Sequence, residues 1–279
     1  MGRFHKVEVG GATMIAVQDS WATMPPTAFF NKTTDSDWDG YRDLLTEEGH
    51  LTLNLGAWIV ISEGRTILVD SGIGGRPTMM PLKEPPALPT VMAEAGVSPN
   101  DIDVVAFSHL HFDHTGWNTW DNDGTPVPQF PNARHIIQQA EWDYWTSSDE
   151  LREGAGYDNV LSPIVDAGLV DFVEGEHVLT SEVVTVSTPG HTPGHVAFAV
   201  NSGGEKAYVI GDAAHHLVQL TETDWCPGAD VNTTDSTASR HMLFDQIEAE
   251  NALIASGHFN FPGLGRAARR DGARYFAPE

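Results

Sequence analysis

The stretch Val104–His114, VVAFSHLHFDH, decides how the rest of the sequence is interpreted. Its opening residues, Val104–Phe107, are all apolar, which is typical of a short strand buried on both faces. Four residues of metal-ligand type follow within six positions: His109, His111, Asp113 and His114. A loop of solvated histidines would explain neither the apolar strand in front nor the apolar residues between these side chains. The stretch therefore predicts a metal site at the end of a buried strand.

The alternation within this stretch predicts where its side chains point. Residues i and i+2 of an extended chain face the same way, so His109 and His111 should aim at one place beyond the strand end. Asp113 and His114 lie on the following turn and should reach a second place nearby. The intervening residues, Leu110 and Phe112, should point into the core. Open α/β sheets bind ligands at the carboxyl ends of their strands, where this segment is expected.

Three later segments repeat the pattern of a short apolar strand followed by a ligand-type residue. The strands are Val183–Ser187, Ala207–Ile210 and Ala252–Ser256, and the residues that follow them are His191, Asp212 and His258. A glycine precedes each of these three residues and lets the backbone turn tightly there. One such residue would usually be structural, but three of them after the His-x-His-x-Asp-His segment predict a shared centre.

These segments resemble the metallo-β-lactamase superfamily. The resemblance extends to Ile67–Gly72 and to Ser187–His195, and it runs from about Leu53 to His258. It implies an α/β fold in which a four-layered αββα sandwich holds two metals at one edge, between the sheets. The remaining strands and helices are interspersed without a linker, so we expect one domain over residues 1–279.

The resemblance also assigns the ligands. It implies that one metal is held by His109, His111 and His191, and the other by Asp113, His114 and His258, with Asp212 and a water or hydroxide bridging them. Nitrogen and oxygen ligands suit Zn²⁺, which we expect as the cofactor, although Mn²⁺, Fe²⁺ or Co²⁺ would also fit. Two such cations lower the pKa of the bridging water from 15.7 to roughly 7, and the hydroxide attacks a carbonyl or phosphoryl centre. The catalytic residues are then Asp113, Asp212 and a third residue, His215.

Two further residues are expected to support the centre. Asp70 follows an apolar strand and is interpreted as a carboxylate that orients a ligand histidine, although a turn-forming Asp before Ser71-Gly72 is nearly as good an interpretation. His195 is interpreted as a packed or supporting histidine that does not bind metal. The single cysteine, Cys226, has no charged activator beside it and is interpreted as inert.

The residue at the bridging position narrows the choice of branch within the superfamily. It is Asp212 and not Cys, which within the superfamily resembles lactonases, thioesterases and phosphotriesterases. The acyl-homoserine lactonases often carry Tyr three places later, where this chain has His215. The sequence around it is similar to the methyl-parathion-hydrolase-like branch. His215 could hydrogen-bond the developing oxyanion, or it could be a pocket wall without a catalytic role.

Aromatic residues gather near the ligand segments. Those expected to line a substrate pocket are Phe29, Phe30, Trp117, Trp225 and Phe259. An apolar pocket suits a lactone with an acyl tail or an aryl ester, whereas ordinary core packing explains some of these rings. Phe29 and Phe30 are the candidates for a lid.

These features predict a dinuclear lactonase or esterase, with a phosphotriesterase activity left open. A glyoxalase-II-like thioesterase is the first alternative. It requires a basic glutathione site on a C-terminal helical region, and the tail 265–279 carries arginines but has a strand-like pattern. A non-hydrolytic metal-binding or redox protein is the second alternative.

Composition limits the partners. The chain of 279 residues has 39 acidic and 15 basic residues, a net charge of −24, which argues against nucleic acid or an anionic membrane. We expect a small-molecule substrate with an apolar part, and the sequence leaves a homodimer open. The sequence shows neither a signal-peptide core nor a run of 18 apolar residues, so the cytoplasm is the expected compartment.

Overall fold

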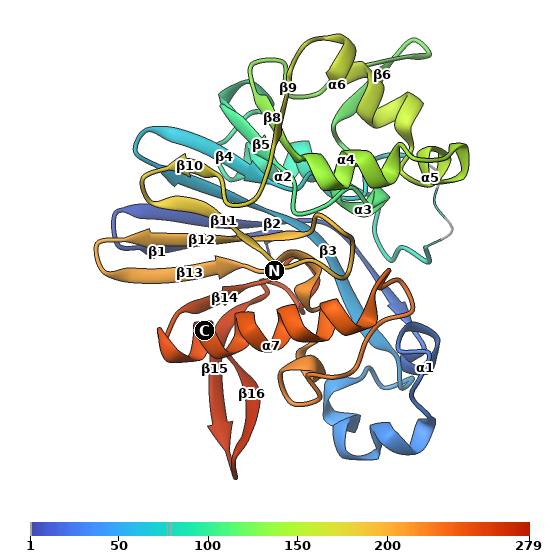
Figure 1. Ribbon diagram of the computed structural model, residues 1–279, viewed down its shortest axis with the longest axis vertical. Coiled ribbons are helices and arrows are strands. Elements are labelled where there is room, and N and C mark those ends of the chain that lie inside the picture. The colour runs from blue at the N-terminus through green and yellow to red at the C-terminus, as the bar shows by residue number, and fades with distance from the viewer. Residues whose placement is uncertain (1, 77, 79) are drawn as a thin grey trace.

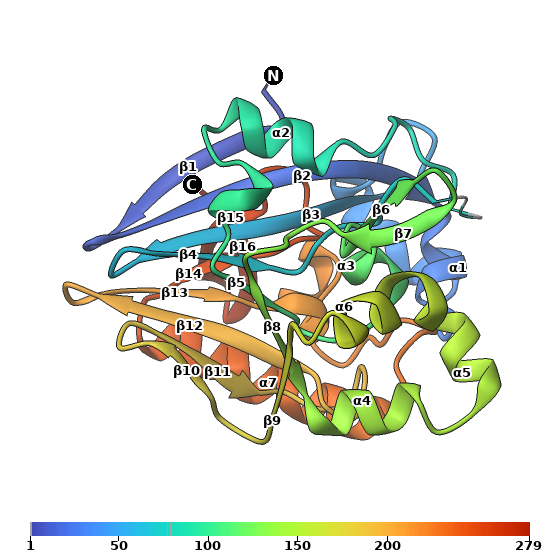
Figure 2. The same ribbon diagram turned by 90° about the horizontal axis from the view of Figure 1, so that it is seen from above.

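The computed structural model describes residues 2–76, 78 and 80–279 and consists of two large sheets that face each other, with helices outside both (Figures 1 and 2). The first sheet has the order β1-β2-β3-β4-β5-β8-β9 and the second the order β10-β11-β12-β13-β14-β15-β16. The strands of the first sheet are β1 (Phe4–Val9), β2 (Ala12–Met24), β3 (Leu51–Ser62), β4 (Arg65–Val69), β5 (Val104–Ala106), β8 (Arg134–Gln138) and β9 (Val170–Val173). Those of the second are β10 (Val178–Thr180), β11 (Val183–Ser187), β12 (Val196–Ser202), β13 (Glu205–Val209), β14 (Leu253–Ala255), β15 (Leu264–Arg270) and β16 (Ala273–Pro278).

Helices and a small hairpin complete the fold. The α-helices are α1 (Pro26–Phe29), α2 (Leu88–Glu94), α3 (Phe112–Thr115), α4 (Gln139–Trp145), α5 (Asp149–Gly154), α6 (Ser162–Asp166) and α7 (Thr233–Ala249). Shorter helical turns are η1 (Asp35–Leu44), η2 (Pro99–Asp101), η3 (Tyr157–Leu161), η4 (Gly211–Ala213) and η5 (Leu217–Leu220). The hairpin pairs β6 (Thr119–Asn122) with β7 (Thr125–Pro128). No helix among the described residues has both the length and the apolar character that crossing a membrane requires.

Three apolar clusters make the four layers. Between the sheets, side chains such as Trp58 of β3 and Phe198 of β12 form one cluster. Val91 of α2 belongs to a second cluster, with residues on the outer face of the first sheet, and Leu243 of α7 belongs to a third, with residues of the second sheet. Each sheet therefore buries both faces, and the predicted αββα sandwich is confirmed.

Some local predictions were wrong. Phe112 was expected in the core, but the chain turns into α3 directly after His111, and 43% of the Phe112 side chain is exposed. Only Leu110 points inward and is fully buried. The β6–β7 hairpin was not predicted, because Pro126 and Pro128 make its second strand resemble a loop.

Candidate metal centre

Four loops at one edge of the sandwich carry the predicted ligands. Each loop follows the carboxyl end of a strand; β5 belongs to the first sheet, and β11, β13 and β14 belong to the second, where β13 and β14 are adjacent. Gly190 is required at its turn because its φ is +133° and an added Cβ would lie 2.0 Å from the backbone N of Ser236 on α7. The close approach of this loop to α7 brings His191 to the centre.

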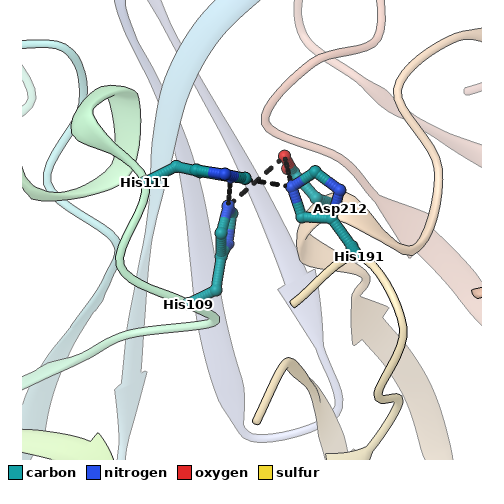
Figure 3. Close-up of side chains that lie close together, drawn as sticks. All are labelled: His109, His111, His191 and Asp212. Carbon is teal, nitrogen blue, oxygen red and sulfur yellow. Dashed lines mark hydrogen bonds and ion pairs between the residues drawn. The ribbon is translucent and has the colours of Figure 1, made fainter. Parts of the chain in front are cut away.

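The first group consists of His109, His111, His191 and Asp212, whose side chains converge in Figure 3. His111 Nδ1 lies 2.8 Å from His109 Nε2 and 2.9 Å from His191 Nε2. Asp212 Oδ2 lies 3.1 Å from His191 Nε2 and 3.5 Å from His109 Nε2. Three ring nitrogens and one carboxylate oxygen thus face a common point.

The second group consists of Asp113, His114 and His258. The Nε2 atoms of His114 and His258 are 3.2 Å apart, and Asp113 Oδ2 lies 3.9 Å and 3.8 Å from them. The other oxygen of Asp212, Oδ1, lies 3.2 Å from His114 Nε2 and 3.0 Å from His258 Nε2. Asp212 therefore presents one oxygen to each group, which is the arrangement of a bridging carboxylate.

The hydrogen bonds on the outer ring nitrogens test whether the two groups fit metal ions. His258 Nδ1 donates to the carbonyl of Asn54 at 2.8 Å, and the Nδ1 atoms of His114 and His191 lie 2.9 Å and 2.8 Å from carboxylate oxygens. A neutral imidazole carries one N–H, so a proton on the outer nitrogen leaves a lone pair on the inner one. Asp212 Oδ1 is buried and has no hydrogen-bond donor among the residues that the structure describes. Inward lone pairs beside a buried carboxylate fit two divalent cations.

The histidines of the centre differ in pKa, because burial and the neighbouring carboxylates act on them in opposite directions. Burial holds the pKa of His109 well below its usual value. Burial also acts to lower the pKa of His191, but the Asp212 and Asp230 carboxylates outweigh it and raise that pKa to about 9. The surrounding histidines outweigh burial at Asp212 and hold its pKa well below the usual range. Asp212 is thus the anionic focus of both groups.

Asp70 and His195 contact the ligand residues and lie outside both groups. Asp70 Oδ2 lies 2.9 Å from His114 Nδ1 and accepts a hydrogen bond from the Ser108 hydroxyl at 2.8 Å. His195 Nε2 accepts a hydrogen bond from the backbone N–H of Asp212 at 2.9 Å. Each contact is of the supporting kind that the sequence predicted.

His215 lies at the centre. Its Nε2 is 3.0 Å from Asp212 Oδ2, and its ring stacks on that of His258 with centroids 5.4 Å apart. Asp212, His215 and His258 form a third group that could hold a metal ion. The position permits two roles, a hydrogen-bond donor beside the centre or an additional ligand.

The predicted pocket residues separate into two kinds. Phe29 is half-buried, and its ring centroid lies 5.3 Å from that of His215. Trp117 is also half-buried, donates its indole N–H to Asp19 and lines a hollow of about 640 Å³ beside the β6–β7 hairpin. Of the other three rings, Phe30 and Phe259 are fully buried, whereas Trp225 is half-buried.

The sequence could not separate core rings from pocket rings. Phe30 and Trp225 pack in a cluster around Trp38, and Phe259 packs edge-on against Phe276. Phe30 and Phe259 are fully buried, so we remove both from the pocket and regard Phe30 as support for the α1 loop and not as a lid.

A second hollow, of about 550 Å³, lies beside the ligand helix α3. Its wall includes Phe112 and Thr115 of α3 and apolar residues from other loops, among them Ile73, Met80 and Val160. This hollow could not be predicted from the sequence, because its residues come from segments distant along the chain.

Two buried carboxylates near the centre were also missed. Asp230 Oδ1 lies 2.8 Å from His191 Nδ1. Glu141 accepts hydrogen bonds from the backbone N–H groups of Leu110 and Gly194, in two ligand loops, at 3.2 Å and 2.8 Å. Glu141 lies in helix α4, directly after β8, and Asp230 lies in the loop before α7, and the sequence pattern that revealed the ligands did not single out either residue.

Residues 53–258 match the family model described as the metallo-beta-lactamase superfamily. An N-acyl homoserine lactonase AttM of Agrobacterium fabrum is 31% identical over 172 residues, which cover 58% of this chain and 60% of the relative. The chain thus spans about 60% of the length of the AttM relatives it matches. An N-acyl homoserine lactonase of Bacillus cereus is 24% identical over 237 residues, covering 80% of this chain and 88% of the relative.

Solved structures share the fold over nearly the whole chain. AidC, a dizinc quorum-quenching lactonase in complex with a product, aligns over 99% of this chain and 97% of its own, with a TM-score of 0.87 and 23% identity. The hydrolase AbOPH aligns over 100% of this chain and 98% of its own, with a TM-score of 0.85 and 22% identity. At these identities the likeness concerns the fold.

Proposed function

Because the chain belongs to the metallo-beta-lactamase superfamily, we propose that it is a dinuclear metal-dependent hydrolase that opens lactones or cleaves esters. The observation that carries this proposal is the Asp212 carboxylate, whose two oxygens face two separate groups of ligand-type side chains. The seven residues proposed to hold the metals are His109, His111, His191, Asp113, His114, His258 and Asp212.

Zinc is the proposed metal, since all seven ligands offer nitrogen or oxygen. Two divalent cations bound there supply a water of lowered pKa and a Lewis acid for the substrate's carbonyl oxygen. The chain itself contributes the geometry. Asp212 sets the separation of the two groups, Asp113 adds a carboxylate that is 14% exposed, and His215 offers a hydrogen-bond donor next to Asp212.

The proposed substrate is a lactone with an apolar acyl tail. Curated relatives are named N-acyl homoserine lactonases, and the hollow beside α3 has a largely apolar wall that starts at Phe112, next to the ligand Asp113. A tail in this hollow would leave the lactone ring over the centre, with Phe29 and His215 on another side. Burial of the tail would contribute about 25 cal/mol per Å² of apolar surface.

The structure does not favour the thioesterase alternative. That alternative needs free basic residues on a helical tail, whereas the tail is the β15–β16 hairpin. Within it, Arg269 and Arg274 form ion pairs with Glu248 of α7.

A substrate panel tests the proposal. Protein with measured metal content would be assayed against lactones of several tail lengths, aryl esters, thioesters, phosphotriesters and β-lactams. We expect the highest kcat/KM on acyl lactones, with activity lost on chelation and restored by Zn²⁺. Full activity in metal-free protein would refute the metal-dependent mechanism, and a preference for thioesters or phosphotriesters would refute the substrate assignment.

A further inference from the structure

Two buried charged residues connect two of the metal-ligand loops. Asp230 lies in the loop before α7, and Arg240 lies on α7 itself. The side chains of both residues are completely inaccessible to solvent, and Arg240 Nη2 lies 3.5 Å from Asp230 Oδ2. Buried charges are costly unless they are paired and hydrogen-bonded, so a pair at this place calls for an explanation beyond packing.

Asp230 contacts the ligand His191. Its Oδ1 lies 2.8 Å from His191 Nδ1, the ring nitrogen that faces away from the centre. The two loops are also joined through their backbones, because Val231 N–H donates to the carbonyl of His191 and Asn232 N–H donates to that of Gly190. A carboxylate on Nδ1 keeps the proton there and directs the Nε2 lone pair inward.

Arg240 contacts the other loop. Its Nε donates to the carbonyl of Ala213, the residue after Asp212, at 2.6 Å. Its Nη1 donates to the carbonyl of Thr223 at 2.7 Å, and its Nη2 donates to the Ser236 hydroxyl at 2.9 Å. The planar guanidinium holds these partners in fixed directions, which the flexible ammonium of lysine could not do.

We propose that Asp230 and Arg240 are positioning residues that fix His191 and Asp212 relative to each other, so that the metal held by His109, His111 and His191 depends on helix α7. The inference rests on the proposed dinuclear centre. Asp230 orients the His191 ring, and Arg240 holds both Asp230 and the backbone that follows Asp212. Asp70 has the corresponding contact to His114 in the other group.

Asp230→Asn is the first test because it keeps the shape of the side chain. The amide oxygen can still accept from His191 Nδ1, but its NH₂ group then faces the Arg240 guanidinium, where two donors meet. Loss of such a supporting partner typically weakens metal affinity about 10–100-fold. We expect a loss of this size for one of the two Zn²⁺ ions, measured by competition with a chromophoric chelator, and a smaller change for the other.

Controls separate positioning from general stability. Asp224→Asn, in the same segment, alters an exposed carboxylate that pairs with His241 and should leave both affinities unchanged. Asp70→Asn should weaken the opposite metal. Nitrogen-15 spectra of the histidine side chains identify the ring affected, and we expect the His191 Nδ1–H signal to shift in Asp230→Asn while that of His114 does not. The melting temperature of the chelator-treated proteins shows whether each variant folds.

Arg240→Lys is a second test variant. We expect it to bind the same metal ion more weakly and to have a lower melting temperature. If Arg240→Lys does not fold, the proposal is still decided by the metal affinity of Asp230→Asn and by whether Asp230→Glu restores that affinity. Wild-type affinity for both metals in Asp230→Asn, or equal weakening of both, would overturn the inference. Wild-type protein that binds no metal would instead overturn the proposed function, and the same titration shows it.

Discussion

Replacement of His215 tests whether this residue acts on the substrate. The Nε2 atom lies 3.0 Å from Asp212 Oδ2, while Nδ1 is buried without a hydrogen-bond partner. His215→Phe keeps the ring packing against Phe29 and His258 and removes both nitrogens. This variant therefore isolates the polar contribution, whereas His215→Ala also leaves a cavity.

The expected magnitude follows from the donors available. A removed oxyanion donor costs roughly 10²–10³ in kcat when it is a main contributor. Two metal ions would share this role here, so we expect a loss of about 10–100-fold in kcat, equal to about 1.4–2.7 kcal/mol of transition-state stabilisation. KM should change little, because the interaction strengthens mainly in the transition state. His215→Tyr should recover part of the rate on lactones, since its hydroxyl restores a donor.

The assay measures kcat and KM on an acyl lactone, with metal content determined in the same samples. An unchanged kcat in His215→Phe, with both metals retained, would refute the reasoning and leave His215 as pocket wall. Loss of one metal in His215→Phe would show instead that the third group, Asp212 with His215 and His258, is a ligand set.

Three further predictions follow from the same geometry. Wild-type protein should contain close to two divalent metals per chain by elemental analysis. Asp212→Ala removes the carboxylate that faces both groups and should lose metal and nearly all activity, and full occupancy in this variant would show that Asp212 does not bridge. Phe112→Ala, at the wall of the 550 Å³ hollow, should raise KM for long-tailed lactones more than for short ones, and equal effects would place the tail elsewhere. Gly190→Ala should lower the free energy of unfolding by at least ~2 kcal/mol in urea titrations, because the added Cβ would lie 2.0 Å from a backbone nitrogen of α7, and a wild-type value would mean that this loop moves freely.

Short-range patterns in the sequence predicted buried strands with ligand-type residues at their ends, whereas the sandwich and the division of the ligands into two groups came from the resemblance to the superfamily. Apolar runs such as Val104–Phe107 become buried strands, and their carboxyl ends meet at one edge. Predictions failed where the surrounding structure decides the conformation or the burial of a residue. Phe112 has the alternation of a strand but lies on a helical turn, and Phe259 is adjacent to a ligand but packs under β16.

These supporting side chains were the least visible from sequence, because Asp19 on β2, Glu141 on α4 and Asp230 in the loop before α7 act through partners that lie far along the chain. Asp19, far from every ligand in sequence, accepts hydrogen bonds from the backbone N–H groups of Ile73 and Leu88 and from the Trp117 indole. It thereby fixes the loop after Asp70 relative to the segment after the His-x-His-x-Asp-His ligands.

Asp19, Glu141 and Asp230 have a common role in this structure. Each is a buried carboxylate that joins two segments at the metal edge, and Glu141 joins the loop of His109 and His111 to that of His191. A buried carboxylate that accepts several N–H groups is satisfied only when all of those segments are in place. Since four separate loops must deliver ligands to within a few ångströms, such carboxylates supply the long-range precision that strand ends alone cannot provide. The acidic composition, which at the level of the sequence argued only against nucleic-acid and anionic-membrane partners, thus includes residues that assemble the edge.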